Sequence, residues 1–279
     1  MGIDFDITSS DAAYRFLLDA LDIYAGNLIM EYTVECNNDE ERFWERNKHR
    51  LKHFDVHDVR FVAFHVTGSL DDCCEIRQSG IRNLQYVLSH STILSRLLHE
   101  SGISFDVDSR IMRIGEVEYN VDYDYYRECG AHTKTDSALE CIAHRLYYDY
   151  CVDGFFSNDN VESYGTEIHK RPEFLIKLIS LSPSAKKLDA YWKATSKPYK
   201  IVFYATADQI HKFTFDLEEN LDPYSGEEQE HIKRWMISAA LSCAFYGCSE
   251  RFIYIRDELY IPPEQILHYE LLDNDSPKK

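Results

Sequence analysis

The sequence predicts an α+β fold in which helices surround a mixed β core with antiparallel character. Apolar residues recur at helical spacing in 14–28 and again in 232–243, which predicts two helices that each bury one face. In the segment 59–66 both alternating sets of residues are largely apolar, as expected of a strand that is buried on both faces. A shorter β-rich segment at 103–123 turns at Gly115, which favours a hairpin.

Residues 1–56 are expected to form a helical extension. Ser10 or Asp11 can cap the first helix, because a short polar side chain accepts hydrogen bonds from the unpaired amides of the first turn. A charged segment at 38–54 indicates a second helix. The extension is expected to pack on the main domain or on a partner.

Residues 57–272 are expected to form the main domain, which opens on the strand described above. A helix that ends at Gly80 and a second helical segment follow this strand. After the hairpin comes a helix whose cap is Thr135 or Asp136.

The second half of the main domain continues the mixed pattern. A short strand begins at Asp153, and a helix begins near Pro172, whose fixed φ suits a first helical position. The segment 198–210 predicts a strand that runs into a helix start. An acidic loop and a helix that stops at Gly247 follow it.

The stretch 250–272 is expected to supply the last two or three strands. Glu258 is expected at the mouth of a hairpin between two of them, shortly before Pro262 and Pro263. The polar tail at 273–279 is expected to be disordered, because it cannot bury enough apolar surface to order itself.

The composition limits the partners of the chain. Lys and Arg total 30 against 48 Asp and Glu, which gives a formal charge of -18. The surface as a whole should therefore repel a phosphate backbone, and any contact with nucleic acid must be local. The same acidity would suit a basic partner, although solubility alone explains it and is the preferred interpretation.

A cytoplasmic location without a membrane partner is expected. The first residues lack the basic and apolar regions of a secretory signal, and the chain has no run of about eighteen apolar residues. The 8 cysteines are irregularly spaced in a chain too large to need disulfides for stability. This usage favours free thiols in a reducing compartment.

Several common chemistries lack sequence support. The chain has neither a P-loop nor a Rossmann fingerprint, and no Ser or Cys stands in a nucleophile-elbow context. Cys129 with His132, and Cys141 with His144, have the spacing of zinc ligand pairs. Helical packing explains the second pair, and such coincidences are common in a chain with 12 His. No metal is expected.

Two distant parts of the chain carry a family resemblance. The first is FHVTG, residues 64–68, followed by CCEIRQSGI, residues 73–81, and the second is ELYIPPEQILHYELL, residues 258–272. Together they resemble the ADP-ribosyltransferase superfamily, in the form whose site residues are His, an aromatic residue and Glu, as in its DNA- and RNA-modifying toxin and PARP-like branch. The resemblance covers about residues 59–272, and only its two ends carry specific motifs. It implies an ADP-ribosyltransferase-like split β core that encloses an NAD+ cleft.

The resemblance implies the catalytic residues Glu258, His65 and Tyr164. Glu258 would hydrogen-bond the nicotinamide ribose of NAD+ and help to deprotonate the acceptor, and His65 would bind the adenosine ribose. Cleavage of the nicotinamide–ribose bond passes through an oxocarbenium-like transition state, so a carboxylate against the developing positive charge is the expected chemistry. An aromatic ring would stack on the nicotinamide, and Tyr164 is preferred to Phe156 because its hydroxyl adds a polar group.

The same resemblance implies further contacts to NAD+. Thr67 and the flexible Gly68 would admit the dinucleotide close to the backbone, and Arg171 would meet the pyrophosphate as a fork-like donor. For Arg171 and its neighbour His169, a solvated helix start explains the charges equally well. The expected NAD+-binding residues are His65, Thr67, Gly68, Phe156, Ser157 and Arg171.

The acceptor is expected to be something other than arginine. Arginine-modifying members of the family carry Glu-x-Glu, whereas Arg256 stands two residues before Glu258. Arg256 would suit an acidic or phosphate-bearing acceptor, which leaves RNA, DNA or a non-arginine protein side chain. The candidates for a local basic track are Lys170, Arg171, Lys186, Lys187 and Lys193.

The sequence therefore predicts a mono-ADP-ribosyltransferase that uses NAD+ as co-substrate and modifies a macromolecular acceptor, with nucleic acid favoured. By resemblance it would act as a toxin or antiphage effector that a neutralising antitoxin protein holds in check. One alternative is an NAD glycohydrolase, in which water replaces the acceptor at the same site. The other is a non-catalytic interaction module that retains the fold.

Overall fold

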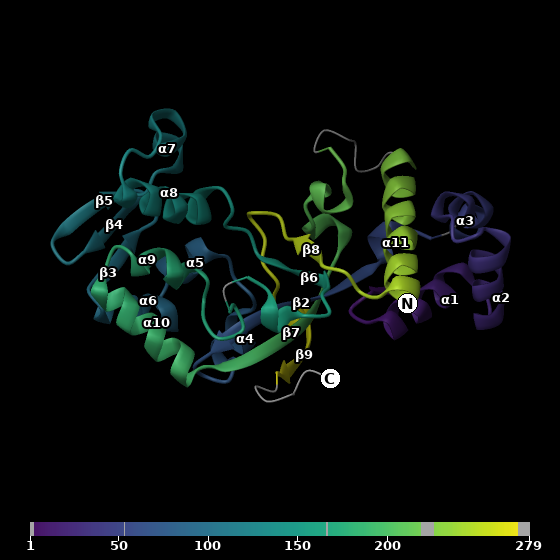
Figure 1. Ribbon diagram of the computed structural model, residues 1–279, viewed down its shortest axis with the longest axis horizontal. Helices are drawn as coiled ribbons and strands as arrows, with labels where there is room; N and C mark the ends of the chain where they lie inside the picture. The colour runs from purple at the N-terminus through teal and green to yellow at the C-terminus, as the bar shows by residue number, and fades with distance from the viewer. Residues whose placement is uncertain (1–2, 53, 166, 219–225, 273–279) are drawn as a thin grey trace. The chain divides into compact units, whose positions relative to one another are not determined.

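The computed structural model describes residues 3–52, 54–165, 167–218 and 226–272 (Figure 1). Its contacts divide the chain into two compact units. Unit 1 comprises residues 1–65, 153–159 and 202–256, and unit 2 comprises residues 66–152, 160–201 and 257–279. The expected disordered tail at 273–279 lies outside the described residues, as do residues 219–225 of the acidic loop.

Unit 1 contains strands of one mixed sheet. They are β1 (Asp4–Asp6), the first part of β2 (Arg60–Ser69), β6 (Asp153–Ser157), the last part of β7 (Lys197–Ala205) and β8 (Arg251–Tyr254). The strand order is β8-β6-β2-β7, and β1 also pairs with β2, in parallel. Strand β6 runs antiparallel to both β2 and β8.

Strand β1 is a departure from the expected helical extension. Ile3, Phe5 and Ile7 alternate with Asp4 and Asp6, and the side chain of Phe5 is fully buried. This period of two residues is a strand signal. Only helices were expected in residues 1–56, so strand β1 was not predicted.

The helices of unit 1 come from residues 10–58 and 207–246. They are α1 (Ser10–Leu21), α2 (Ala25–Ile29), the π-helix η1 (Met30–Glu35), α3 (Glu40–Asn47), α11 (Gly226–Tyr246) and the 3-10 helices η2 (Lys48–Leu51), η3 (Val56–Asp58), η5 (Ala207–Gln209) and η6 (Lys212–Phe215). Ser9, rather than Ser10 or Asp11, caps α1 by accepting from the amide of Ala12. The hydroxyl of Ser10 instead donates to the carbonyl of Cys243 in α11 at 2.8 Å.

Aromatic side chains fill the core of unit 1. The ring centroids of Phe5 and Phe61 are 5.7 Å apart, and those of Phe156 and Trp235 are 5.4 Å apart, within the range of favourable ring pairs. Strands β1, β2 and β6 and helix α11 thus contribute to one core. The expected boundary after residue 56 therefore differs from the division of contacts, which falls after residue 65.

Helix α11 confirms the helix predicted at 232–243 and extends it toward its N-terminus. It begins at Gly226, and Glu227 and Glu228 lie in its first turn, where negative charge is favourable. In the part of the chain that the structure describes, neither α11 nor another helix is both long and apolar enough to cross a membrane.

Unit 2 combines strands of the mixed sheet with a second, antiparallel sheet. Its strands are the last part of β2, the first part of β7, β9 (Ile266–Leu271), and the separate set β3 (Ile103–Asp106), β4 (Ile111–Ile114) and β5 (Val117–Asn120). Its helices are α4 (Cys74–Ser79), α5 (Leu84–Ser89), α6 (Ile93–Glu100), α7 (Tyr123–Cys129), α8 (Lys134–Tyr147), α9 (Phe174–Ile179), α10 (Pro183–Thr195) and the 3-10 helices η4 (Val161–Ser163) and η7 (Pro263–Gln265).

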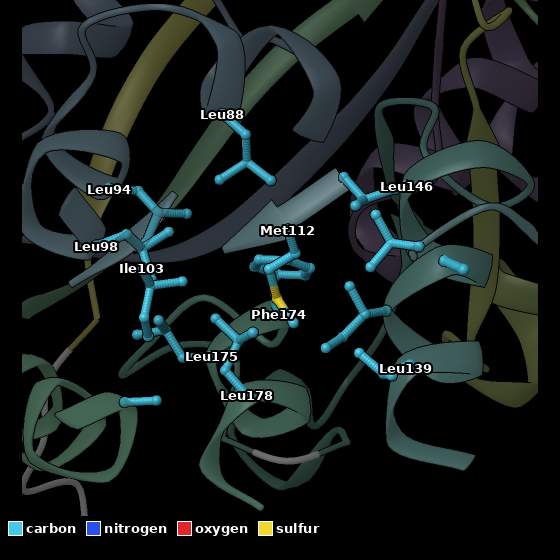
Figure 2. Packing of buried hydrophobic residues seen from close by; sticks show 14 of the residues in the cluster. Leu88, Leu94, Leu98, Ile103, Met112, Leu139, Leu146, Phe174, Leu175 and Leu178 are labelled. Carbon is cyan, nitrogen blue, oxygen red and sulfur yellow. The ribbon is translucent and has the colours of Figure 1, made fainter. Parts of the chain in front are cut away.

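An aliphatic core holds the helices of unit 2 against the sheet of β3, β4 and β5. Figure 2 shows Met112 of β4 and Phe174 of α9 in the middle of a ring of leucine and isoleucine side chains. Leu94 and Leu98 of α6 belong to this ring and are almost fully buried. Because burial of each such side chain contributes about 1.5–3 kcal/mol, α6 is fixed against the core along this face.

Glycine residues end elements where the sequence predicts it. Gly80, Gly115 and Gly247 have φ angles of 79°, 59° and 95°, a region that glycine enters without steric cost. Gly80 follows α4, Gly115 turns β4 into β5, and Gly247 follows α11. The structure is thus mixed helix and strand with antiparallel sheets, which is compatible with the expected α+β class.

The hairpin expected around Glu258 is wrong. Strands β8 and β9 are separated by three strands in the order β8-β6-β2-β7-β9, so each pairs with a strand from elsewhere in the chain. The connection at 255–265 is much longer than the two to five residues of an ordinary hairpin loop. It contains η7, which starts at Pro263.

Helix α8 begins earlier than predicted. Thr133, rather than Thr135, is its N-cap, and Asp136 completes a capping box as the residue at the third helical position. The seven-residue helix α7 was not predicted.

One pair of cysteines is joined. Cys243 and Cys248 form a disulfide, so the expectation of free thiols is wrong at these two positions. The left-handed Gly247 reverses the chain after α11, which brings the two sulfur atoms together. Both cysteines are buried in unit 1.

Candidate active site

His65 lies in β2 with one ring nitrogen engaged by the protein. Its Nδ1 is 2.9 Å from the carbonyl oxygen of Asp153, and because a carbonyl only accepts, Nδ1 carries the hydrogen in this contact. In the neutral form of the ring, Nε2 is then unprotonated and can accept a hydrogen bond from a ligand hydroxyl. Thr67 faces the same side of the strand, and both side chains are half-buried, whereas Phe64 and Val66 are buried.

Phe156 and Ser157 face the core of unit 1. Phe156 is fully buried against Phe61 and Trp235. Ser157 is also fully buried and donates from Oγ to the carbonyl of Ser249 at 2.6 Å. Because neither side chain is exposed to a ligand, their expected contacts with NAD+ are corrected to packing roles.

Gly68 is required by the protein itself. A Cβ at this position would lie 2.4 Å from the carbonyl carbon of Lys170, far inside contact distance. The carbonyl of Gly68 accepts a 2.8 Å hydrogen bond from the indole of the buried Trp192. This glycine therefore admits the backbone of the turn at 167–171, where the resemblance implied a dinucleotide.

Arg171 forms a buried ion pair in unit 2. Its side chain pairs with Asp189, and the two residues are 9% and 8% exposed. A buried charge needs such a partner, because an unpaired buried ion is strongly destabilising. The guanidinium is thus engaged within the protein, which corrects its expected contact with the pyrophosphate of NAD+.

Part of the expected basic track is paired with acidic side chains. Lys170 lies 3.2 Å from the carboxylate of Glu167, and Lys193 pairs with the same group. Together with Asp189, which pairs with Arg171, this carboxylate offsets two of the five candidate positive charges. The two candidates outside these pairs are exposed on α10, namely Lys186 and Lys187.

The acid stability of unit 2 is expected to depend on Glu167. Hydrogen bonds from Lys193 and Lys170 lower the pKa of Glu167 to about 2. A carboxyl group whose pKa falls on folding stabilises the protein above its unfolded pKa, and this contribution is lost as the pH drops through the folded pKa. Glu167→Gln should therefore reduce the loss of stability between about pH 5 and pH 2, by about 0.5 kcal/mol for a partly exposed pair.

Urea unfolding of native and variant proteins at pH 7, 5 and 3 measures this effect. Glu116→Gln removes an equal charge from the exposed turn between β4 and β5 and should leave the acid dependence unchanged. The same decline in native protein and Glu167→Gln would contradict the expectation.

His169 is buried without a partner for one ring nitrogen. It is 6% exposed, and among the described residues its Nδ1 has no hydrogen-bond partner. Burial lowers the pKa of His169, and the charge of Lys170 lowers it further, so the ring is neutral at pH 7. The solvated helix start considered for this residue is therefore wrong.

Tyr164 directly follows η4 and is half-buried. Its backbone amide donates to the carbonyl of Val161 at 3.3 Å, which closes the short 3-10 turn. Stacking of its ring on the nicotinamide of NAD+ stays a prediction.

Glu258 lies in a turn, and its side chain is exposed. The carboxylate of the adjacent Asp257 accepts a hydrogen bond from Tyr150, and the carbonyl of Asp257 accepts from the amide group of Asn83 at 3.2 Å. Burial raises the pKa of Tyr150, and the charges of Asp257 and Glu258 raise it further. The turn is thus held by its neighbours while the carboxylate of Glu258 reaches solvent.

The two resemblance segments of unit 2 meet in an antiparallel bridge. Ile81 and Ile261 exchange backbone hydrogen bonds of 2.8 and 3.1 Å. The backbone of Gly80 also packs directly against Ile261, since a Cβ on Gly80 would lie 2.1 Å from the carbonyl oxygen of Ile261. The end of the CCEIRQSGI segment therefore fixes the chain three residues after Glu258. Such support can hold a carboxylate in a defined position.

The expected site residues are divided between the units. Unit 1 contains His65, Phe156 and Ser157, and unit 2 contains Thr67, Gly68, Tyr164, Arg171 and Glu258. Within unit 2, the turn at 167–171 brings Arg171 next to Gly68. The neighbours of Glu258 were not predicted: Asp257 is visible as an adjacent carboxylate, but Tyr150 and Asn83 lie far away in the sequence and carry no local signal.

The Cys/His pairs do not converge. Cys129 and Cys141 are exposed, and the ring of His144 packs against Tyr123 and Tyr148 with centroid distances of 5.2 and 4.9 Å. Across the described ranges, no three or more His, Cys, Asp or Glu side chains gather as metal ligands would.

No protein-family model, curated protein or solved structure that was compared with the chain matches it.

Proposed function

We propose that the chain is a mono-ADP-ribosyltransferase, which cleaves NAD+ and transfers ADP-ribose to a macromolecular acceptor. The observation that carries the proposal is the Ile81–Ile261 bridge, which joins the two resemblance segments of unit 2 beside Glu258. The two segments occur in the same order along the chain as the motifs of the family, and they also pack together. One shared site explains both facts better than two separate coincidences.

Glu258 is the proposed catalytic carboxylate. Departure of nicotinamide leaves positive charge on the ribose, and a carboxylate next to that charge lowers the barrier. The nucleophilic atom of the acceptor then bonds to the ribose carbon and loses its proton, so the products are nicotinamide, the modified acceptor and a proton. An exposed carboxylate on a turn that Asn83 and Ile81 hold in place supports this role.

His65 is the proposed contact to a ribose hydroxyl of NAD+. The hydrogen bond from its Nδ1 to Asp153 supports an accepting Nε2, which is complementary to a hydroxyl donor. Thr67, on the same side of β2, is proposed to add a second polar contact. Tyr164 is the proposed ring for the nicotinamide.

Nucleic acid is the proposed acceptor class. Arg256 replaces the first Glu of the arginine-modifying pattern, which supports an acceptor other than arginine. A role as a toxin or antiphage effector, held by a neutralising protein, is consistent with an enzyme that consumes NAD+ and modifies nucleic acid.

Incubation of the native protein with labelled NAD+ and bacterial lysate tests the proposal. We expect the label to become attached to macromolecules and to be released by nuclease but not by protease. Release by protease alone would identify a protein acceptor, and free ADP-ribose alone would identify an NAD glycohydrolase. Unchanged NAD+ would contradict an enzymatic role at this site.

A further inference from the structure

An open surface cavity of about 390 Å³ lies beside α5 and α6 in unit 2. Its lining includes Ser89, His90, Ser95, Arg96, His99 and Glu100. Hydroxyl, imidazole and guanidinium groups can donate hydrogen bonds, and Glu100 is the one carboxylate in this lining. Arg96 supplies the charged donor of this lining, and an anionic group is the ligand to which such a donor bonds most strongly.

Arg96 is available to such an anion. In the part of the chain that is described, its guanidinium forms no ion pair or side-chain hydrogen bond, although the chain has 48 acidic against 30 basic residues. Some other arginines are paired, such as Arg60 with Asp4 at 2.6 Å and Arg113 with Glu118 at 2.9 Å. The charge of Arg96 is partly offset by Glu75, whose pKa it lowers against the effect of burial, and by Glu100 in the same lining, but within the described residues no carboxylate is bonded to it.

Helix α6 holds the donors in place. Its buried face carries Leu94 and Leu98, which pack into the core of unit 2 (Figure 2). Ser95, Arg96 and His99 stand on the other side at helical spacing, where residues three and four apart are neighbours. The first amides of α6 already donate to side chains of the protein, so a ligand would meet side chains rather than backbone.

His90 ends a column of stacked side chains at the same cavity. The guanidinium of Arg82 lies 3.3 Å from the ring centroid of Tyr260 and 4.6 Å from that of Tyr86. Tyr86 in turn stacks on His90, with centroids 3.8 Å apart and an interplanar angle of 17°. Because His90 is exposed, its outer face offers a planar surface on which a nucleobase can stack.

The column joins the cavity to the turn of Glu258. Tyr260 is two residues after Glu258, and Asn83, the N-cap of α5, donates to the carbonyl of Asp257. Helix α5 has 6 residues and is therefore about 9 Å long. One short, capped helix thus separates the cavity from the proposed catalytic carboxylate.

We propose that this cavity is a phosphate subsite for a nucleotide unit of the acceptor. Arg96 and His99 contact the phosphate, and the base stacks on His90. Binding of a nucleotide is inferred from the cavity alone, whereas the role of the cavity as an acceptor site rests on the proposed function. Free nucleotides and single-stranded nucleic acid present the same phosphate and base, so both are sources of the ligand.

Calorimetric titration with uridine compounds tests the subsite. These compounds lack the adenosine half of NAD+, so an NAD+ site is not expected to bind them. We expect uridine 5′-monophosphate to bind at least about tenfold more tightly than uridine or inorganic phosphate. Arg96→Gln should weaken this binding about tenfold, as expected for one charge-assisted contact. Lys134→Gln, which removes an equal charge from the exposed first turn of α8, should leave it unchanged within about twofold.

A 5′-phosphorylated oligouridylate distinguishes the two sources. Binding at least tenfold tighter than the mononucleotide, and weakened by salt, would identify single-stranded nucleic acid, and equal binding would identify a free nucleotide. Equal affinity for uridine and its phosphate, or for native protein and Arg96→Gln, would overturn the subsite.

Different results would contradict the subsite and the proposed function. Nicotinamide release from NAD+ is measured on the same preparation of native protein. Release without binding of the uridine nucleotide overturns the subsite alone. Binding that depends on Arg96, without release of nicotinamide, supports a nucleotide site and overturns the proposed enzymatic role.

Discussion

Glu258→Ala is expected to lower the rate of NAD+ cleavage about 10²–10³-fold, the loss that follows removal of one group aimed at transition-state charge. The carboxylate opposes a positive charge that develops on the ribose only during bond cleavage. The variant should therefore lose kcat much more than it raises KM. Initial rates of nicotinamide release over a range of NAD+ concentrations measure both constants.

Glu264→Ala is the matched control for this variant. Glu264 is also an exposed glutamate of the segment between β8 and β9, and its loss should change the rate less than about twofold. Because Glu258 is exposed, its replacement should change the free energy of unfolding by no more than about 0.5 kcal/mol. Equal turnover by native protein and Glu258→Ala would contradict the catalytic assignment. In a bacterial host, growth arrest is expected with native protein and not with Glu258→Ala.

Features that depend on neighbouring residues could be predicted from the sequence. The apolar run of β2 requires burial on both faces wherever the strand lies in the fold. Gly80, Gly115 and Gly247 adopt positive φ because an element ends at each of them. Ser9 and Thr133 were missed as caps by one and two residues, since several small polar side chains near a helix start can accept the same amides.

Pairing between distant segments could not be predicted in the same way. The sequence of 250–272 contains two β-rich runs, and adjacency in the chain favoured a hairpin. The structure instead pairs β8 with β6, and its strand order places β9 next to β7. Backbone hydrogen bonds carry no residue-specific signal, so the Ile81–Ile261 bridge was equally invisible before the fold was known.

The candidate site shows the same difference between features that are visible locally in the sequence and features that depend on distant segments. His65 and Glu258 were singled out by type and position, and both keep side-chain atoms that a ligand can reach. Arg171 and Ser157 were expected to face NAD+ because the sequence does not show burial. Asp189, which neutralises Arg171, lies on helix α10, so the buried pair becomes apparent only when α10 packs beside the turn at 167–171.

Gly80→Ala is expected to destabilise the protein by about 2 kcal/mol more than Gly130→Ala. Both glycines end helices with nearly the same backbone, φ 79° and ψ -175° at Gly80 against φ 73° and ψ 167° at Gly130. Alanine is strained in this region by about 1–3 kcal/mol in either position. The surroundings differ, because an added Cβ meets the carbonyl of Ile261 at 2.1 Å in one case and nothing within 4 Å in the other.

The difference between these variants isolates the contact that joins the two resemblance segments. Urea unfolding of each protein gives the free energies, and nicotinamide release is measured where both variants are folded. Because Ile261 is three residues after Glu258, a shift of the Ile261 segment that relieves the clash would move the turn that carries the carboxylate. Gly80→Ala should therefore lose NAD+ cleavage while Gly130→Ala retains it. Equal destabilisation and equal activity would mean that the bridge does not position Glu258, and would remove the observation on which the proposed function stands.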